Sequence, residues 1–302
     1  MIIVFVMNAS QPVFSVIIPT YSRPQQIKDC LESLTALNYP RDDFEVVVVD
    51  DGSPMDLQPI VNKFIDTLNL RLIKQSNSGP AKARNTGAQA ARGEFLVFTD
   101  DDCQPHPNWL KAFASGFETA PNSILGGHTL NKLSDNIYSE ASQLLIDYLY
   151  QYYNSLGQKP LFFASNNIAL PKAVFEQMGR FNTNFPLAAA EDREFCDRAL
   201  QGGYVLNYVP EAEIDHAHYL TLPKFWRQHF NYGRGAYVFH QIKAKRQQEK
   251  IKVEPISFYL NLLGYPLVRK SLTQGTLIAA LFWLSQVANA AGFFKQKLAT
   301  AP

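Results

Sequence analysis

The chain has 302 residues, of which 46% are hydrophobic, so it can bury one large core and a smaller appendage. Its formal net charge of +1 gives no support to nucleic-acid binding through a strong overall field. Three widely spaced cysteines without a CxxC pair argue against a structural zinc site or a disulfide framework and favour a reducing compartment. The apolar segment from Met1 to Met7 is short and has no basic residue before it, so it predicts neither a signal peptide nor a membrane span.

From Val13 to about Tyr208, short apolar runs alternate with stretches of helical spacing. The run at 44–49 is β-branched and almost uniformly apolar, which is typical of a buried parallel strand. Strand and helix alternating at this pace predict an α/β sheet with right-handed crossovers. The expected strands cover 13–18, 44–49, 70–73, 94–98 and 204–209, and the expected helices cover 25–37, 57–69 and 80–91.

Three of the expected strands end in polar, turn-rich segments. These exits are Pro19-Thr20-Tyr21, with Arg23 shortly after it, then Asp50-Asp51-Gly52-Ser53, and finally Asp100-Asp101-Asp102. Ligands of open α/β sheets gather where the strands end at their carboxyl edge. We therefore expect the three exits to share one site.

The three consecutive aspartates at 100–102 close an apolar run, although aspartate is depleted from strands. Packed together, their carboxylates repel one another and resist ionisation unless a cation is present. A hard divalent metal such as Mg²⁺ or Mn²⁺ resolves that conflict, and substrate phosphates usually fill its remaining positions. The alternative is a solvated acidic turn.

The segment from Ser76 to Asn85 opens a helix with a loop of small residues. Lys82 and Arg84 lie in or near the first helical turn, where a cation opposes the helix dipole. This placement suits an anion such as pyrophosphate.

A second acidic centre, Glu191-Asp192, begins another expected helix. Acidic residues are common at a helix start, but a carboxylate at a helix mouth is also well placed as a general base for a hydroxyl nucleophile. Upstream, Asn166 and Asn167 can orient a polyhydroxylated acceptor or merely turn the chain. Downstream, His216 can complete a metal sphere or be an ordinary structural histidine, and His218 is the weaker candidate.

Taken in order, these segments resemble the family 2 inverting glycosyltransferases, which have the GT-A nucleotide-diphospho-sugar transferase fold, an α/β sheet with flanking helices. The resemblance spans roughly residues 13 to 218. It implies that Pro19, Thr20, Tyr21 and Asp50 cradle the nucleoside, with Asp51 nearby, and that Arg84 lies near the base and diphosphate. Arg23, Asp101, Asn166 and Asn167 are further candidates for substrate binding. The implied metal ligands are Asp100, Asp102 and His216, with Mn²⁺ or Mg²⁺ as cofactor, and the implied catalytic base is Asp192 with Glu191 beside it.

The resemblance implies a single displacement that inverts the anomeric centre of a nucleotide-diphospho-sugar donor. Two departures stand out. Ala188-Ala189-Ala190 replaces the glycine that often precedes the Glu-Asp pair, and Gln228-His229-Phe230-Asn231-Tyr232 lacks the Arg-Trp of the QxxRW box. The second departure argues for one sugar per encounter and against a processive polymerase.

The composition changes after about residue 240, so we expect a catalytic domain over 1–240 and a helical apolar tail over 241–302. Lys243, Lys245, Arg246, Lys250 and Lys252 precede two uncharged runs that Arg269 and Lys270 separate. One interpretation is a membrane-embedded or interfacial helix, which would place the enzyme at the cytoplasmic face of the inner membrane with a glycan or lipid-linked acceptor from cell-surface synthesis. The other is a helical hairpin packed on the catalytic domain, because the apolar run is marginal against the roughly 20 residues that a span needs.

Two other functions remain open. A nucleotidyltransferase that makes sugar nucleotides should carry a glycine-rich basic loop after the first strand, and Pro19 to Pro24 has no glycine. A membrane-associated protein that binds a nucleotide sugar without turnover is disfavoured only by the intact acidic residues.

Overall fold

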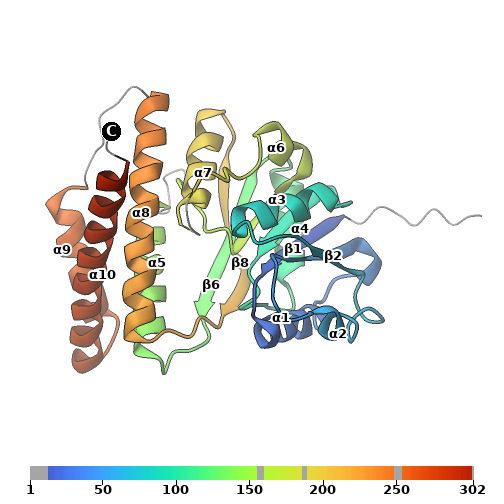
Figure 1. Cartoon of the computed structure of the whole chain (residues 1–302), viewed down its shortest axis with the longest axis horizontal. Coiled ribbons are helices and arrows are strands. Elements are labelled where there is room, and N and C mark those ends of the chain that lie inside the picture. Colours follow the sequence, from blue (N-terminus) through green and yellow to red (C-terminus); the bar gives the residue numbers. More distant parts are fainter. Residues whose placement is uncertain (1–12, 155–159, 186–188, 248–253, 301–302) are drawn as a thin grey trace, which may run out of the picture.

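The computed structural model describes residues 13–154, 160–185, 189–247 and 254–300. The N-terminal segment, Ala188, and the tail lysines Lys250 and Lys252 lie outside the described residues. Within them, one mixed sheet has the order β3-β2-β1-β4-β7-β6-β8-β5. Helices cover it, and the C-terminal helices stand beside it as a separate bundle (Figure 1).

The first half of the sheet is parallel. Strands β1 (Phe14–Thr20), β2 (Phe44–Asp50), β3 (Leu70–Lys74) and β4 (Phe95–Thr99) alternate with helices α1 (Pro24–Thr35), α2 (Gln58–Val61) and α3 (Pro80–Ala90). All seven residues of both β1 and β2 are buried, as their uninterrupted apolar sequences predict. The helix expected over 57–69 is correct only at its start, since regular helix ends at Val61 and turns continue to Leu68.

The second half of the sheet mixes directions. Strand β7 (Asn167–Pro171) pairs antiparallel with β4 and β6 (Ile124–Asn131), whereas β6 runs parallel to β8 (Leu206–His216). The short β5 (Cys103–Pro105) pairs antiparallel with the end of β8, which brings Cys103 opposite His216. This pairing places the segment after the aspartates beside the histidines.

Two apolar layers cover the sheet. Helices α1 and α4 (Trp109–Thr119) pack on one face with Phe14, Val16 and Ile18, while α3, α6 (Lys172–Gln177) and α7 (Glu191–Gln201) pack on the other with Ile17 and Phe98. Burial of apolar surface holds these layers together, because each Å² removed from water contributes about 25 cal/mol of stabilisation.

The C-terminal helices have a core of their own. Helix α5 (Ile137–Tyr153) and the long α8 (Leu222–Gln247) share it with α9 (Ile256–Gly264), the 3₁₀ turn η2 (Tyr265–Val268) and α10 (Leu272–Ala299). Helix α10 runs along α8 (Figure 1), and their backbones nearly touch: a Cβ on Gly233 would lie 1.9 Å from the Asn289 carbonyl oxygen. The predicted domain boundary at 240 falls inside α8.

Candidate active site

The exits of β1, β2 and β4 meet at one cavity of about 1370 Å³. Thr20 Oγ1 donates a hydrogen bond to Asp101 Oδ2 at 2.7 Å, so the first and last of these exits are in direct contact. Arg23 Nη1 donates to Asp101 Oδ1 and to Asp102 Oδ2, each at 3.0 Å. The cavity wall includes Pro19, Thr20, Tyr21, Arg23, Asp51, Arg84 and all three aspartates of the cluster.

The Asp50-Asp51 pair is tied to the loops around it. Asp51 accepts hydrogen bonds from the backbone N–H groups of Ser78 and Gly79 at 2.9 and 2.8 Å and so anchors the loop before α3. Asp50 Oδ1 accepts from the Ser53 N–H at 2.9 Å and lies outside the cavity wall. Both carboxylates thus shape this turn, and of the two only Asp51 also faces the cavity.

Asp102, His216 and His218 form a cluster whose possible ligand atoms all lie within 4.8 Å of one another. His216 Nε2 lies 3.2 Å from Asp102 Oδ1, and His218 Nδ1 lies 3.2 Å from Asp102 Oδ2. Burial acts to raise the pKa of Asp102, but the two histidines and Arg23 outweigh it and hold that pKa well below its usual range. The carboxylate suits either of the two expected ions, and of these Mg²⁺, which prefers oxygen ligands alone, fits the two imidazoles less well.

Asp100 is not part of this cluster. Its Oδ1 accepts a 2.6 Å hydrogen bond from Arg84 Nη2 instead. The Nη1 of the same guanidinium donates to Glu191 Oε1 at 3.1 Å, so Arg84 connects the aspartate cluster to the second acidic centre. The set that the structure brings together therefore differs from the predicted one, Asp100, Asp102 and His216, in having His218 where Asp100 was expected.

Glu191 and Asp192 begin α7 and differ in their partners. Burial is the largest cause that raises the pKa of each, that of Glu191 to about 7, and the neighbouring Asp192 carboxylate raises the pKa of Glu191 further. Glu191 is paired with Arg84, whereas the hydrogen bonds to Asp192 in the described chain come only from backbone N–H groups, those of Arg193 at 2.7 Å and Ser165 at 3.4 Å. Of this pair, both in the cavity wall, Asp192 is therefore the carboxylate without a cationic hydrogen-bond partner.

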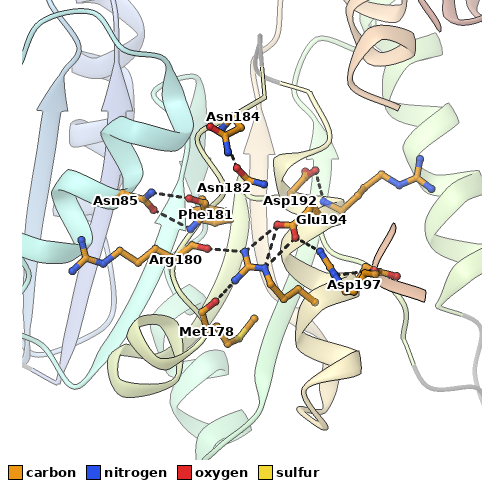
Figure 2. Close-up of polar contacts among 12 residues, drawn as sticks. Asn85, Met178, Arg180, Phe181, Asn182, Asn184, Asp192, Glu194 and Asp197 are labelled. Carbon is orange, nitrogen blue, oxygen red and sulfur yellow. Dashed lines mark hydrogen bonds and ion pairs between the residues drawn. The ribbon is translucent and has the colours of Figure 1, made fainter. Parts of the chain in front are cut away.

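The segment 178–181, which precedes α7 in the chain, is bound both to α3 and to α7 (Figure 2). The Asn85 side chain on α3 exchanges two hydrogen bonds with the Phe181 backbone, at 2.8 and 3.0 Å. On α7 itself, Arg198 binds Glu194 one turn earlier and donates to the carbonyl oxygens of Met178 and Arg180. These contacts fix the helix that presents Asp192.

Ala190 occupies the N-cap position of α7 with a φ of 71°, in the left-handed region that favours glycine. The segment is held there from α8, because a Cβ on Gly235 would lie 2.3 Å from the Ala189 carbonyl oxygen. Ala190 therefore adopts a glycine-like backbone conformation beside a tight helix contact.

We predict that Gly235→Ala displaces residues 189–190 and lowers both stability and transfer. Overpacking of this kind typically costs 1–3 kcal/mol of unfolding free energy. Gly264→Ala is the control, because nothing lies within 4 Å of the added carbon there. Urea unfolding and initial rates on both variants test this; equal behaviour of the two would show that the contact does not constrain the loop.

The two asparagines predicted to bind the acceptor lie in different environments. Asn166 lines the cavity, and its buried Oδ1 has no hydrogen-bond partner within the described chain. Asn167 lies behind the cavity wall, where its amide binds Trp109 Nε1 at 2.9 Å and the carbonyl oxygens of His128 and Ala212. Both of its N–H donors are thus used to join β7 to β6 and β8, and its side chain does not face an acceptor in the cavity.

The sequence singled out Gln228 only as the start of the incomplete QxxRW segment and did not predict its contact with His218. Gln228 Oε1 lies 3.1 Å from His218 Nε2, while its Nε2 donates to Ser142 Oγ and to the Tyr232 hydroxyl, both at 3.0 Å. The contact orients His218 by binding the nitrogen that faces away from Asp102. No local pattern indicates it, since ten residues and a helix start separate the two side chains.

Comparisons with known proteins show which sequences and structures this chain is similar to. The family model described as glycosyl transferase family 2 matches residues 15–179. The glycosyltransferase AglE of Haloferax volcanii is 30% identical over 214 residues, which cover 68% of this chain and 67% of that protein. The poly(ribitol-phosphate) β-N-acetylglucosaminyltransferase TarS of Staphylococcus aureus is 38% identical over 114 residues, 37% of this chain but only 20% of that protein.

Among solved structures, the mannosyltransferase PcManGT of Pyrobaculum calidifontis in complex with GDP-Man and Mn²⁺ superposes with a TM-score of 0.67 at 19% identity, covering 96% of this chain and 88% of that one. Residues 1–349 of TarS superpose with a TM-score of 0.54 at 20% identity, covering 95% and 90%. At these identities the superpositions establish the GT-A fold, as predicted.

Proposed function

Since this chain belongs to glycosyl transferase family 2, we propose that it transfers one sugar per encounter from a nucleotide-diphospho-sugar to an acceptor hydroxyl, with inversion at the anomeric carbon. The observation that supports this most strongly is the position of Asp192. Its carboxylate, free of any cationic hydrogen-bond partner in the described chain, lines the same cavity as Arg84 and the Asp102 cluster. Leaving-group and base functions can then act on opposite sides of one sugar.

In this mechanism the donor nucleotide lies against Pro19, Thr20, Tyr21 and Asp51. Arg84 stabilises the charge that develops on the departing diphosphate, which is electrostatic catalysis of the leaving group. Asp192 takes the proton from the acceptor hydroxyl as its oxygen attacks the anomeric carbon from the opposite face. One bond forms and one breaks in a single displacement, without a covalent enzyme intermediate.

Asp102, His216 and His218 are the residues that would hold a divalent cation, and we favour Mn²⁺ because two of the three ligands are imidazoles. When bound, the cation would neutralise charge on the donor diphosphate. The Mn²⁺ and GDP-Man bound to PcManGT, and the UDP-GlcNAc bound to TarS, support a donor of this class.

The proposal of single-sugar transfer rests on the region after His218. Gln228 begins the segment that lacks the Arg-Trp pair, and its amide is already bound to His218, Ser142 and Tyr232. A processive synthase would need another device to hold its growing product.

The stereochemical claim has a direct test. Proton NMR of the first product formed from an α-linked nucleotide sugar should show a β-linked sugar. An α-linked product would require a double displacement and would contradict the role of Asp192.

We further propose that α10 docks the enzyme on a membrane, in keeping with a role in cell-surface glycan or glycolipid synthesis. Among the described helices, α10 is the one long and apolar enough to cross a bilayer. Its packing against α8 and α5 favours docking over insertion. Leu277, Trp283 and Leu298 are 55, 60 and 77% exposed, and the charges that flank these apolar residues are Arg269, Lys270, Lys295 and Lys297.

We predict that Trp283→Glu combined with Leu298→Glu abolishes binding to vesicles that contain anionic lipid. Each large apolar side chain contributes about 1.5–3 kcal/mol on burial, and the basic residues add an attraction that salt weakens. Ile65→Glu, a substitution of a 48% exposed residue far from α10 in the sequence, is the control. Flotation of the full chain in low salt is the measurement; if wild type and the double variant float equally, α10 is not the docking element.

A further inference from the structure

Arg193, the residue after the proposed base, has an unusual environment for a cation. The cations around it are each bound to carboxylates: Arg198 to Glu194, Lys243 to Asp197, and Arg246 to both of these acids. Within the described residues, the Arg193 guanidinium contacts no carboxylate. It contacts aromatic rings only.

Three rings surround this guanidinium. Its central carbon lies 5.3 Å from the ring centroid of Phe239 on α8, 5.8 Å from that of Phe162 and 5.9 Å from that of Tyr153 on α5. Each such contact stabilises the cation through the face of a ring and leaves the five N–H donors available. Arg193 also lines the large cavity, so a cation with free donors faces the space beside Asp192.

Beyond Arg193 the cavity continues between the C-terminal helices. Its wall there includes Tyr259 and Leu262 on α9, together with Ala290, Phe293 and Phe294 on α10. Phe294 is 58% exposed, so this end of the cavity reaches the molecular surface. The opening lies on an apolar stripe of α10 formed by residues 283, 287, 290 and 294, since these positions follow one face of a helix.

The orientation of the Arg193 side chain decides between two uses of its charge. Asp192 Oδ1 accepts its hydrogen bond from the Arg193 backbone N–H, not from the guanidinium. The guanidinium lowers the pKa of Asp192 only as a nearby charge, and the larger effect of burial still leaves that pKa raised. Its donors therefore remain available to a second anion, and a phosphate matches the planar fork of arginine.

We propose that the acceptor carries a phosphate that binds Arg193 and an apolar chain that leaves the cavity between α9 and α10 beside Phe294. This inference rests on the proposed function, because it defines the acceptor of that transfer. The phosphate fixes the acceptor head beside Asp192, and the chain leads from the catalytic cavity to the apolar stripe on α10.

Calorimetric titration of the full chain tests the proposal without requiring transfer. The probes are decyl phosphate and decyl glucoside, both below their micelle concentrations, and glucose 1-phosphate. Decyl phosphate should bind more tightly than either other probe. Arg193→Gln should weaken it at least tenfold while changing decyl glucoside by less than twofold, and Arg193→Lys should retain most of the affinity because it keeps the charge.

Lys243→Gln is the matched control. The Lys243 ammonium lies 5.8 Å from the centroid of the same Phe239 ring but outside the cavity wall. This variant should bind all three probes as wild type does. Thermal unfolding of each variant excludes loss of fold as the cause.

Three results would overturn the inference. If decyl phosphate binds equally well without the Arg193 side chain, the phosphate does not contact Arg193. An equal loss of both decyl probes shows that Arg193 is merely structural. If glucose 1-phosphate binds as tightly as decyl phosphate, the apolar chain contributes nothing to binding, and the acceptor is a soluble sugar phosphate. A failure of the proposed transfer itself is recognised separately, because the wild-type chain would then release no nucleoside diphosphate.

Discussion

Asp192→Asn should retain the donor affinity of the wild-type enzyme and lose transfer by about 10²–10⁴-fold. The amide keeps the shape of the side chain and, through its single oxygen, one of the two backbone hydrogen bonds, that from Arg193 or that from Ser165. It cannot take the proton of an acceptor hydroxyl. Burial raises the pKa of Asp192, so wild-type transfer should also fall with decreasing pH at a higher pH than an exposed aspartate would impose. Single-turnover rates and calorimetric donor titration measure the two quantities separately.

Asp197→Asn is a suitable control, because Asp197 lies on the same helix and binds Lys243 and Arg246 instead of lining the cavity. It should leave the rate of transfer near that of wild type. Loss of donor binding in Asp192→Asn with transfer largely intact would mean that the roles of base and donor contact are reversed.

The second large effect is expected at the cluster around Asp102. Asp102→Ala should lose metal-dependent donor binding and activity together, since it removes the carboxylate that both His216 and His218 approach at 3.2 Å. A chelator added to the wild type should reproduce the loss, and Mn²⁺ should restore activity to the wild type but not to the variant.

His106→Ala provides the comparison for this experiment. His106 also lies against acidic side chains, 3.3 Å from Glu213 and Asp215, but outside the cavity wall. It should behave as wild type in metal titrations. Full activity of Asp102→Ala in the presence of a chelator would rule out the metal assignment.

The sequence was most informative where local patterns determine the outcome. Continuous apolar runs predicted β1, β2 and β4, and parallel pairing then required Thr20, Asp51 and Asp101 to meet at one edge. The α/β sheet followed from the alternation of strands and helices, and the resemblance of these exits to family 2 glycosyltransferases implied the enzyme class.

Contacts between distant segments were not predictable in the same way. Arg84 binds Asp100 and Glu191 at once, across 16 and 107 residues, whereas the histidines contact Asp102. The antiparallel pairing of β5 with β8 brings His216 to Asp102, and the return of α8 brings Gln228 to His218. Periodicity gives helices and strands, but these partners depend on the path of the chain.

The tail illustrates the same limit. Its apolar runs correctly indicated helices, but composition alone did not distinguish a membrane segment from a packed hairpin. The near-contact of Gly233 with Asn289, and a Cβ position on Gly292 only 1.9 Å from the Phe230 carbonyl oxygen, show close packing of α10 on α8. The Arg193 environment arises from this bundle, because Tyr153 and Phe239 come from α5 and α8.

Incubation of the full chain with a panel of nucleotide-diphospho-sugars and Mn²⁺, with release of nucleoside diphosphate as the readout, tests the central claim most directly. Our account predicts release from at least one sugar nucleotide, suppressed by a chelator and absent in Asp102→Ala. Formation of pyrophosphate from a nucleoside triphosphate and a sugar phosphate, or tight donor binding without any release, would contradict it and indicate a nucleotidyltransferase or a non-catalytic binding protein instead.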